Sequence, residues 1–127
     1  MGMNRLWLIV GLGGFLGSVA RYLASTQLAR LWPALFPWGT FAVNVIGSLV
    51  VGLVFGLSQR HQWLTAEWRL FLATGFCGGF TTFSAFAFEN MRLIQHGDYG
   101  TFALYAIASV VLCIAGAAVG YFISTLT

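Results

Sequence analysis

The sequence predicts an all-α membrane protein with four transmembrane helices, of which the third is broken near the middle of the membrane. Two observations carry this prediction. Of the 127 residues, 59% are hydrophobic and only 7% are charged, too few to cover a water-soluble surface. The charges also leave long apolar stretches between them, and a transmembrane helix needs about 20 mostly apolar residues. The six dispersed arginines form no dense basic patch, so a nucleic-acid-binding domain is excluded as well.

The charge-free stretches define the four spans in order. They cover residues 6–20, 31–59, 70–88 and 99–127, with 15, 29, 19 and 29 residues. Each of the last three fits one crossing, and the first fits if its helix carries Arg21 near the far end. We therefore expect one transmembrane domain over residues 1–127, with spans at about 4–29, 38–58, 69–95 and 99–125. No strand is expected, because the spans are apolar on all sides rather than alternating with period two.

Short linkers separate the spans, and none of them carries an enzyme motif. Pro33 and Pro37 mark the first linker, because proline cannot continue a helix. The P-loop, HExxH and GxSxG patterns are missing from the sequence. His61 and His96 fall in predicted loops without acidic or cysteine partners. We therefore expect a protein that is not an enzyme.

The arginines near the span ends do not specify an orientation in the membrane, although positive residues normally mark the cytoplasmic side. One side would carry Arg5, Arg60 and Arg69. The other side would carry Arg21, Arg30 and Arg92. Either another feature fixes one orientation, or copies insert both ways and pair antiparallel, an arrangement called dual topology.

Glycine spacing and chain length favour a homo-oligomer. The chain has 16 glycines, with GxxxG spacings at 13/17, 52/56 and 116/120, and such small residues let helices approach closely in lipid. Four short helices leave little room to enclose an aqueous path within one chain. Some glycine faces must pack inside the subunit, and the surplus fits a second copy, with a two-fold dimer as the default.

Asn44, near the middle of the second span, has two possible roles. Polar residues inside a membrane are costly to bury and therefore mark candidate sites. The amide can form an interhelical hydrogen bond, or it can line a pore as a donor. The residues alone leave both roles open.

The third span contains a candidate break. Gly78 and Gly79 are followed by Thr81 and Thr82, and an unwound segment at this depth must line a cavity or lie inside protein. Broken transmembrane helices present free carbonyls to cations and free N–H groups to anions. The alternative is a continuous helix whose glycines pack against a neighbour.

Phenylalanines follow the candidate break. Phe83 and Phe86 are three residues apart and share a helix face. Most such stripes pack in a core or against lipid, but the positive edge of the ring also allows weak contact with an anion. Together with the Asn44 amide and the hydroxyls of Thr82 and Ser84, the rings would form a path that has donors but no full charge. Such a path suits a small anion, which can enter and still leave.

Two charged residues, Arg21 and Glu89, flank this path, and their positions help to distinguish the alternative functions. Arg21 would either snorkel or form an electropositive vestibule. Glu89 ends the third span, where we expect a water-exposed mouth. A small multidrug-type proton-coupled exporter also has four spans, but it needs a titratable carboxylate deep in a span, and spans 1, 2 and 4 have none. A non-transporting membrane scaffold would have no use for Asn44 beside a broken helix.

Several segments resemble the Fluc (CrcB) fluoride channels. Residues 13–22 (GGFLGSVARY) resemble the first-span signature of that family, and residues 37–44 (PWGTFAVN) its second. Residues 75–86 (GFCGGFTTFSAF) resemble its third, which is highly specific. Tyr105 and Ser109 match the positions of its pore-lining Tyr and Ser. The sequence departs at Ser18, where the family more often has Ala, and at Ala85, where many members have Thr, which puts a role for that second position in doubt.

The resemblance implies a dual-topology, antiparallel homodimer in a bacterial inner membrane that exports fluoride passively through two narrow antiparallel pores. It implies a pore lined by Asn44, Phe83, Phe86, Thr82, Ser84, Tyr105 and Ser109. The two phenylalanines of a given pore would come from different subunits, and Arg21 would lie at the vestibule. The broken third helices would meet at the two-fold axis, where the backbone carbonyls of Gly78 and Thr81 from both copies would hold a structural Na⁺. The implied partners are thus fluoride, a second copy and the lipid bilayer.

Overall fold

The computed structural model describes residues 3–127 and contains no strand in that range. Its elements are α1 (Met3–Leu31), α2 (Trp38–Arg60), α3 (Ala66–Arg69), the π-helical η1 (Leu70–Cys77), α4 (Gly78–Phe80), α5 (Phe83–Gln95) and α6 (Tyr99–Ser124). Within this part of the chain, four segments are long and apolar enough to cross a membrane: Arg5–Leu31, Trp38–Arg60, Ala66–Gln95 and Tyr99–Ser124. The prediction of four spans is confirmed.

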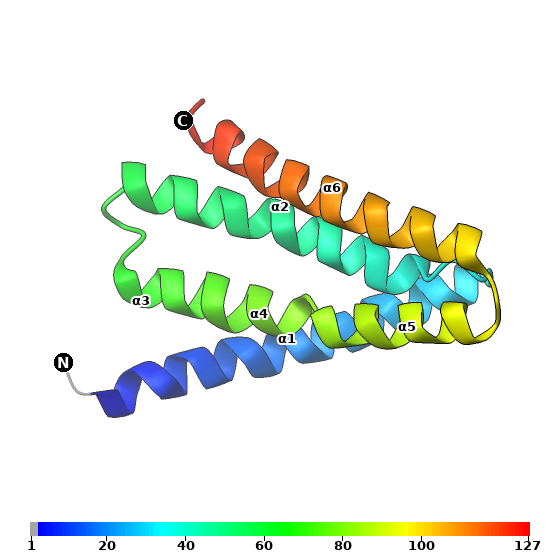
Figure 1. The fold of residues 1–127 in the computed structure, drawn as a ribbon. Coiled ribbons are helices and arrows are strands. Elements are labelled where there is room, and N and C mark those ends of the chain that lie inside the picture. Colours follow the sequence, from blue (N-terminus) through cyan, green and yellow to red (C-terminus); the bar gives the residue numbers. More distant parts are fainter. Residues whose placement is uncertain (1–2) are drawn as a thin grey trace.

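The helices pack as two pairs. α2 and α6 run parallel and side by side along most of their length, and α1 lies along η1 and α4 on the other side of the bundle (Figure 1). A short connection, residues 32–37, joins α1 to α2, and Gly97, with a φ of 74°, makes the turn before α6. Asp98 then caps α6 by accepting a hydrogen bond from the Thr101 N–H.

Glycines allow both pairs to approach closely. An added Cβ at Gly52 or Gly120 would collide with the backbone of Ala117 or Leu49, and one at Gly17 would collide with that of Phe76. The other glycines of the three GxxxG spacings likewise face helices of the same chain. The glycines of these three spacings are therefore used within the chain, whereas Gly11 and Gly100 have open space beside them. A surplus for a second copy stays a prediction, and dimerisation must be argued from other features as well.

The bundle has a thin core and an apolar outer surface. Val54, Leu64 and Ala73 form its buried cluster, whereas large side chains such as Ile107 and Ile114 are exposed. Exposed tryptophans lie near both ends of the bundle, at positions 32 and 38 on one end and 7, 63 and 68 on the other. An apolar band between two tryptophan belts is the surface of a multi-pass membrane protein.

Candidate functional site

The segment between α4 and α5 is not helical. Thr81 (φ −91°, ψ 157°) and Thr82 (φ −152°, ψ 118°) both have extended backbone conformations. The π-helical stretch η1 precedes this interruption by three residues. The interruption therefore falls where the Gly-Gly-Phe-Thr-Thr sequence stands, within the third candidate span.

Side chains replace the helical hydrogen bonds that the interruption removes. In a continuous helix the Thr82 N–H would bond to the Gly78 carbonyl, but here it donates to Asn44 Oδ1 at 2.8 Å. The Ala85 N–H would bond to the Thr81 carbonyl, but it donates to Thr82 Oγ1 at 3.1 Å, which caps α5. The carbonyl oxygens of Gly78 and Thr81 thus lose their helical donors.

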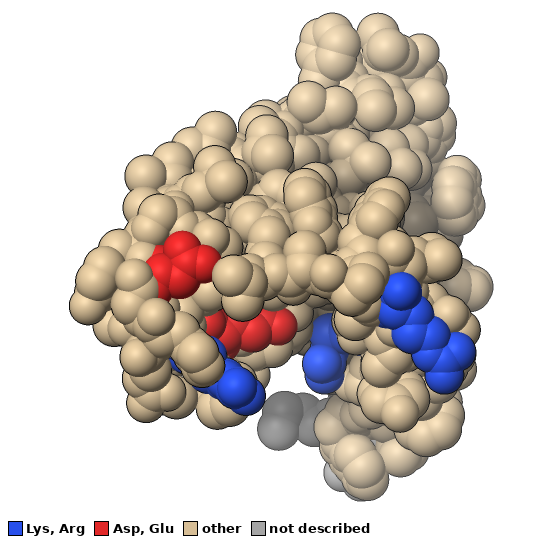
Figure 2. Space-filling view, turned by 90° about the vertical axis from the view of Figure 1, so that its right-hand side faces the viewer, with Lys and Arg blue, Asp and Glu red and all other residues tan. Residues whose placement is uncertain are grey.

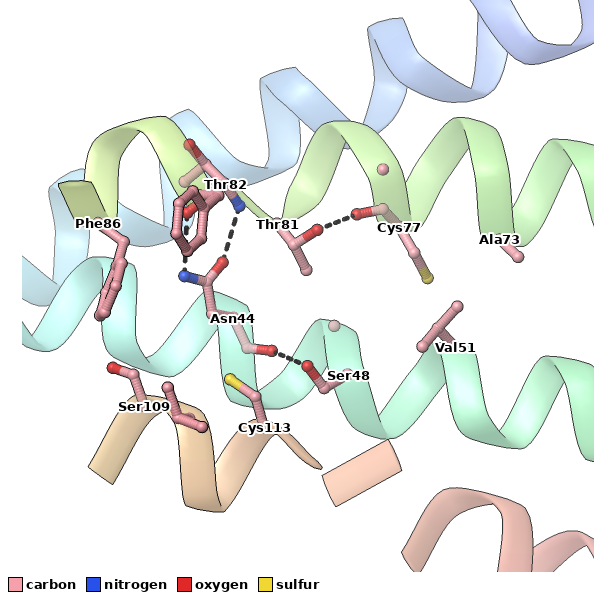
Figure 3. Close-up of a pocket in the computed structure, with 14 residues that line it drawn as sticks. Asn44, Ser48, Val51, Ala73, Cys77, Thr81, Thr82, Phe86, Ser109 and Cys113 are labelled. Atoms are coloured by element: carbon pink, nitrogen blue, oxygen red, sulfur yellow. Dashed lines mark hydrogen bonds between the residues drawn. The ribbon is translucent and has the colours of Figure 1, made fainter. Parts of the chain in front are cut away.

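Two side chains from neighbouring helices also donate hydrogen bonds to carbonyls at the interruption. Asn44 Nδ2 donates to the Thr82 carbonyl at 3.1 Å, so the Asn44 amide holds the Thr82 backbone from both sides (Figure 3). Arg21 Nε donates to the Gly79 carbonyl at 3.0 Å. The interhelical hydrogen bond suggested for Asn44 is therefore present, and it uses one of the two N–H groups of the amide.

A pocket of about 380 Å³ opens beside the interruption, between α2, the third span and α6 (Figure 3). Seven of the sequence-predicted site residues line it: Asn44, Gly78, Thr81, Thr82, Phe83, Phe86 and Ser109. All the residues lining this pocket are uncharged. The Ser109 Oγ atom is buried without a hydrogen-bond partner in the described part of the chain. The pocket thus combines amide and hydroxyl groups with aromatic rings.

Three sequence-predicted residues do not line this pocket. The Ser84 hydroxyl lies 3.2 Å from that of Thr82, so one of these two hydroxyls donates to the other. Arg21 reaches the Gly79 carbonyl from α1. Tyr105 is fully buried, and its ring lies 5.1 Å from that of Phe86.

Glu89 lies beside open pockets, as expected for a mouth, but it is also hydrogen-bonded within the bundle. Its Oε1 accepts a hydrogen bond from the Tyr105 O–H, and its Oε2 accepts one from the Thr40 Oγ1, both at 2.7 Å. Glu89 also lines two pockets of about 360 and 230 Å³ beside the α1–α2 connection. Charged side chains gather around a hollow at this end of the molecule (Figure 2). Glu89 is thus tied to two helices and does not simply face water.

Sequence reasoning missed Thr40 as a member of this group. Thr40 is 49 residues from Glu89 in the sequence, and Tyr105 is 16 residues from it. No spacing rule links residues so far apart, and the hydroxyl of Thr40 carried no signal apart from its place in the second-span motif. Continuous contacts now connect Phe86, Tyr105, Glu89 and Thr40.

The two phenylalanines share a face but differ in burial. Their ring centroids lie 5.4 Å apart. Phe83 is 78% exposed in the single chain, whereas Phe86 packs on Tyr105. Phe86 is therefore held by its own chain, and Phe83 projects away from it.

Comparisons with known proteins agree with the motifs. Residues 8–121 match the family model described as CrcB-like protein, Camphor Resistance (CrcB). The chain is 54% identical over 106 residues to a fluoride-specific ion channel FluC of Bacteroides fragilis, covering 80% of this chain and 81% of the relative. It is 42% identical over 116 residues to that of Azobacteroides pseudotrichonymphae, covering 91% and 93%. The match to the family model spans most of the sequence, and the chain belongs to the CrcB-like protein family.

Proposed function

We propose that this chain is a fluoride-selective ion channel. The observation that carries the proposal is the uncharged pocket beside the interruption, which is lined by an amide, hydroxyls and phenylalanine rings. The family relatives named above are fluoride-specific ion channels, which agrees with the expectation that the chain is not an enzyme. The two alternatives, a proton-coupled exporter and a scaffold, are not favoured by these relatives.

The pocket offers hydrogen-bond donors to a dehydrated fluoride ion and contains no positive charge that would bind the ion too tightly to release it. The second N–H of the Asn44 amide and the partnerless Ser109 hydroxyl are available to donate. One of the Thr82 and Ser84 hydroxyls donates to the other, so the hydroxyl that accepts this bond keeps its own hydrogen available to donate. The edges of Phe83 and Phe86 add weak positive potential. An anion held in this way can still move on, because no cation binds it tightly.

The Glu89 group extends this path toward the end of the bundle. Because both carboxylate oxygens accept hydrogen bonds, the negative charge is held by Thr40 and Tyr105 rather than presented bare to the ion. The expected role of Tyr105 as a pore residue then runs through its contacts with Phe86 and Glu89. Arg21 retains its two terminal nitrogens for a vestibule while its Nε binds the Gly79 carbonyl.

The functional unit proposed here is an antiparallel homodimer with two pores. Phe83 projects from the chain, as expected if a pore takes one phenylalanine from each subunit. An added Cβ at Gly78 would meet its nearest neighbour only at 3.9 Å, so the backbone there is open to a partner. The even division of arginines and the tryptophans at both ends of the bundle suit insertion in either orientation. On this proposal the interruption lies at mid-membrane on the two-fold axis.

The chemistry of the interruption fits the structural Na⁺ that the family resemblance implies. The Gly78 and Thr81 carbonyl oxygens have lost their helical donors to Asn44 and Thr82. Neutral carbonyls at a broken helix suit a hard monovalent cation. Gly78 and Thr81 from both copies would hold the ion, and the ion would supply positive charge that joins the two broken helices.

We place the channel in the bacterial inner membrane as a passive exit route for fluoride. A potential of 100 mV, negative inside, favours the outward distribution of a monovalent anion by about 2.3 kcal/mol, or about 50-fold. This drive needs no proton coupling, and the pocket lining contains no titratable carboxylate. The membrane potential is therefore sufficient to move the ion.

An efflux assay tests the proposed function. Purified protein in liposomes loaded with fluoride or chloride should release fluoride, read by an F⁻-selective electrode, and retain chloride. Equal chloride efflux would contradict fluoride selectivity, and efflux that requires a proton gradient would favour the exporter.

A labelling experiment tests dual topology separately. A cysteine added at the C-terminus, in a variant with Cys77 and Cys113 replaced by alanine, should react from both faces of the membrane. Labelling from one face alone would refute insertion in both orientations.

A further inference from the structure

A second groove shares no lining residue with the pocket at the interruption. At the end of the bundle where α1 begins, the first turns of α1 diverge from α3 and η1 (Figure 1). The groove between them measures about 420 Å³, and its lining comes from Arg5, Ile9, Thr65, Glu67, Trp68 and Phe71. The helices close again at Gly13, where an added Cβ would collide with the Phe71 carbonyl. The groove is thus a wedge, open toward the end of the spans.

Charge is confined to one level of the wedge. Arg5 Nη2 and Glu67 Oε2 form an ion pair 3.1 Å long, with side chains 67% and 27% exposed. The pair uses one nitrogen of the guanidinium and one oxygen of the carboxylate, which leaves a donor face on Arg5 and an acceptor on Glu67. The Thr65 hydroxyl accepts from the Trp68 N–H and keeps its own hydrogen to donate. One cation, one anion and one hydroxyl donor therefore face the same opening.

Apolar side chains make up the rest of the wedge. Ile9 and Phe71 line it, and Trp68, which is 53% exposed, packs edge-on against Phe71. Tryptophan at a span end lies at the level of lipid headgroups. Ile9 and Phe71 follow Arg5 and Glu67 by four residues each, about one helical turn. The groove thus changes from charged to apolar groups along its length, as a phospholipid does between its headgroup and its acyl chains.

We propose that this groove binds a phospholipid with a primary-ammonium headgroup, phosphatidylethanolamine. The phosphate pairs with Arg5 and Thr65, the ammonium donates to Glu67, and one acyl chain lies against Ile9 and Phe71. A choline headgroup lacks N–H donors for Glu67, and a glycerol headgroup lacks the positive charge. This site goes beyond the proposed ion conduction and does not depend on it.

A titration of lipid-stripped protein tests the proposal. Dioleoyl phosphatidylethanolamine, phosphatidylcholine and phosphatidylglycerol are added in detergent micelles, and bound lipid is counted by native mass spectrometry. We expect phosphatidylethanolamine to bind about fivefold more tightly than phosphatidylglycerol, the effect of one charge pair at a membrane surface. It should also bind more tightly than phosphatidylcholine, whose quaternary ammonium has no N–H to donate to Glu67. Soluble glycerophosphoethanolamine should bind far more weakly, because it lacks acyl chains. Equal binding of phosphatidylethanolamine and phosphatidylcholine would overturn the proposal.

Variants separate the two charges from the shape of the groove. Glu67→Gln should abolish the preference for phosphatidylethanolamine over phosphatidylcholine, and Arg5→Gln should weaken all three lipids. Ile9→Trp should block binding while it retains both charges. Arg69→Gln, in the same helix α3 but outside the groove lining, is the control and should bind as the parent does. A preference that persists in Glu67→Gln, or a cross-link between two copies through Ile9→Cys, would contradict a lipid site.

Discussion

The contact between α2 and α6 differs from the contact between α2 and the third span in how the backbone polar groups are hydrogen-bonded. Where α2 meets α6, glycines bring two regular helices together, and each helix satisfies its own backbone. Where α2 meets the third span, the third span is not helical for two residues, Thr81 and Thr82. The Asn44 side chain of α2 forms hydrogen bonds with the Thr82 backbone there. The second contact leaves the second N–H of the Asn44 amide available to a ligand. The difference indicates that the chain concentrates its chemistry where a side chain has replaced a helical hydrogen bond.

Asn44→Ala should have the largest effect on this comparison. It removes both bonds to Thr82 and leaves the Thr82 N–H unpaired, at about 1–3 kcal/mol. The Thr82 carbonyl retains its helical donor, because Thr82 is the N-cap of α5. It also removes a pore donor. We expect fluoride efflux from liposomes to fall about 100-fold, which corresponds to a barrier higher by about 2.7 kcal/mol.

Asn90→Ala provides the matched control for that variant. Asn90 is also buried, but its amide bonds to the Phe86 carbonyl one turn back in the same helix. We expect Asn90→Ala to retain efflux within about threefold, because a bond within one helix adds about 1 kcal/mol or less. Equal losses of efflux in the two variants would show that removing any buried amide impairs conduction, and that the position of Asn44 at the interruption is not special.

Phe83→Ile and Phe86→Ile should each reduce fluoride efflux about tenfold. Isoleucine retains apolar bulk but lacks the positive ring edge, an effect of about 1.4 kcal/mol. Size-exclusion chromatography should show an unchanged assembly, because Phe83 makes few contacts in its own chain. Phe15→Ile, at an exposed position of α1, is the control. Full conduction in both pore variants would show that the two rings only pack and do not contribute to fluoride conduction.

Arg21→Gln should have a smaller effect, about fivefold on efflux. The guanidinium binds the Gly79 carbonyl at the end of α4, and a cation at a helix C-terminus contributes about 1 kcal/mol. Arg30→Gln, at the exposed end of the same helix, should leave efflux unchanged. If Arg30→Gln lowers efflux as much as Arg21→Gln does, general surface charge rather than the cap controls conduction.

Gly120→Ala should have the smallest effect on conduction. Its Cβ would collide with the Leu49 backbone of α2, so we expect a lower unfolding temperature and a stability loss of about 1–3 kcal/mol. The folded fraction of Gly120→Ala should retain the fluoride-to-chloride efflux ratio of the parent. A changed ratio would mean that the regular α2–α6 contact also determines selectivity.

The four helices were predictable from sequence because burying a charge in lipid is costly, so the arginines and acidic residues delimit the spans. The position of the interruption was a candidate, because two glycines and two threonines are adjacent in the chain. Which groups would satisfy it was not predictable. The bond from Arg21 to Gly79 links residues 58 positions apart, and that from Asn44 to Thr82 links residues 38 apart.

Two details lay beyond the sequence for the same physical reason. The sequence showed three GxxxG spacings but not that the glycines of all three pack within one chain. It placed Glu89 at a mouth, and Glu89 does line two pockets at the end of the bundle. The sequence did not show that Thr40 and Tyr105 bind both of its oxygens. Each detail concerns which tertiary partner a residue meets, and helical periodicity carries no information about that.

The central claim is that the uncharged donors beside the interruption pass fluoride and exclude chloride. The reversal potential of the purified protein in a planar bilayer tests it most directly, with a tenfold fluoride gradient and equal chloride on both sides. We predict a reversal potential of about 59 mV in magnitude, the value for a membrane permeable to fluoride alone. A reversal potential near zero would show that chloride carries the current, and it would contradict the claim.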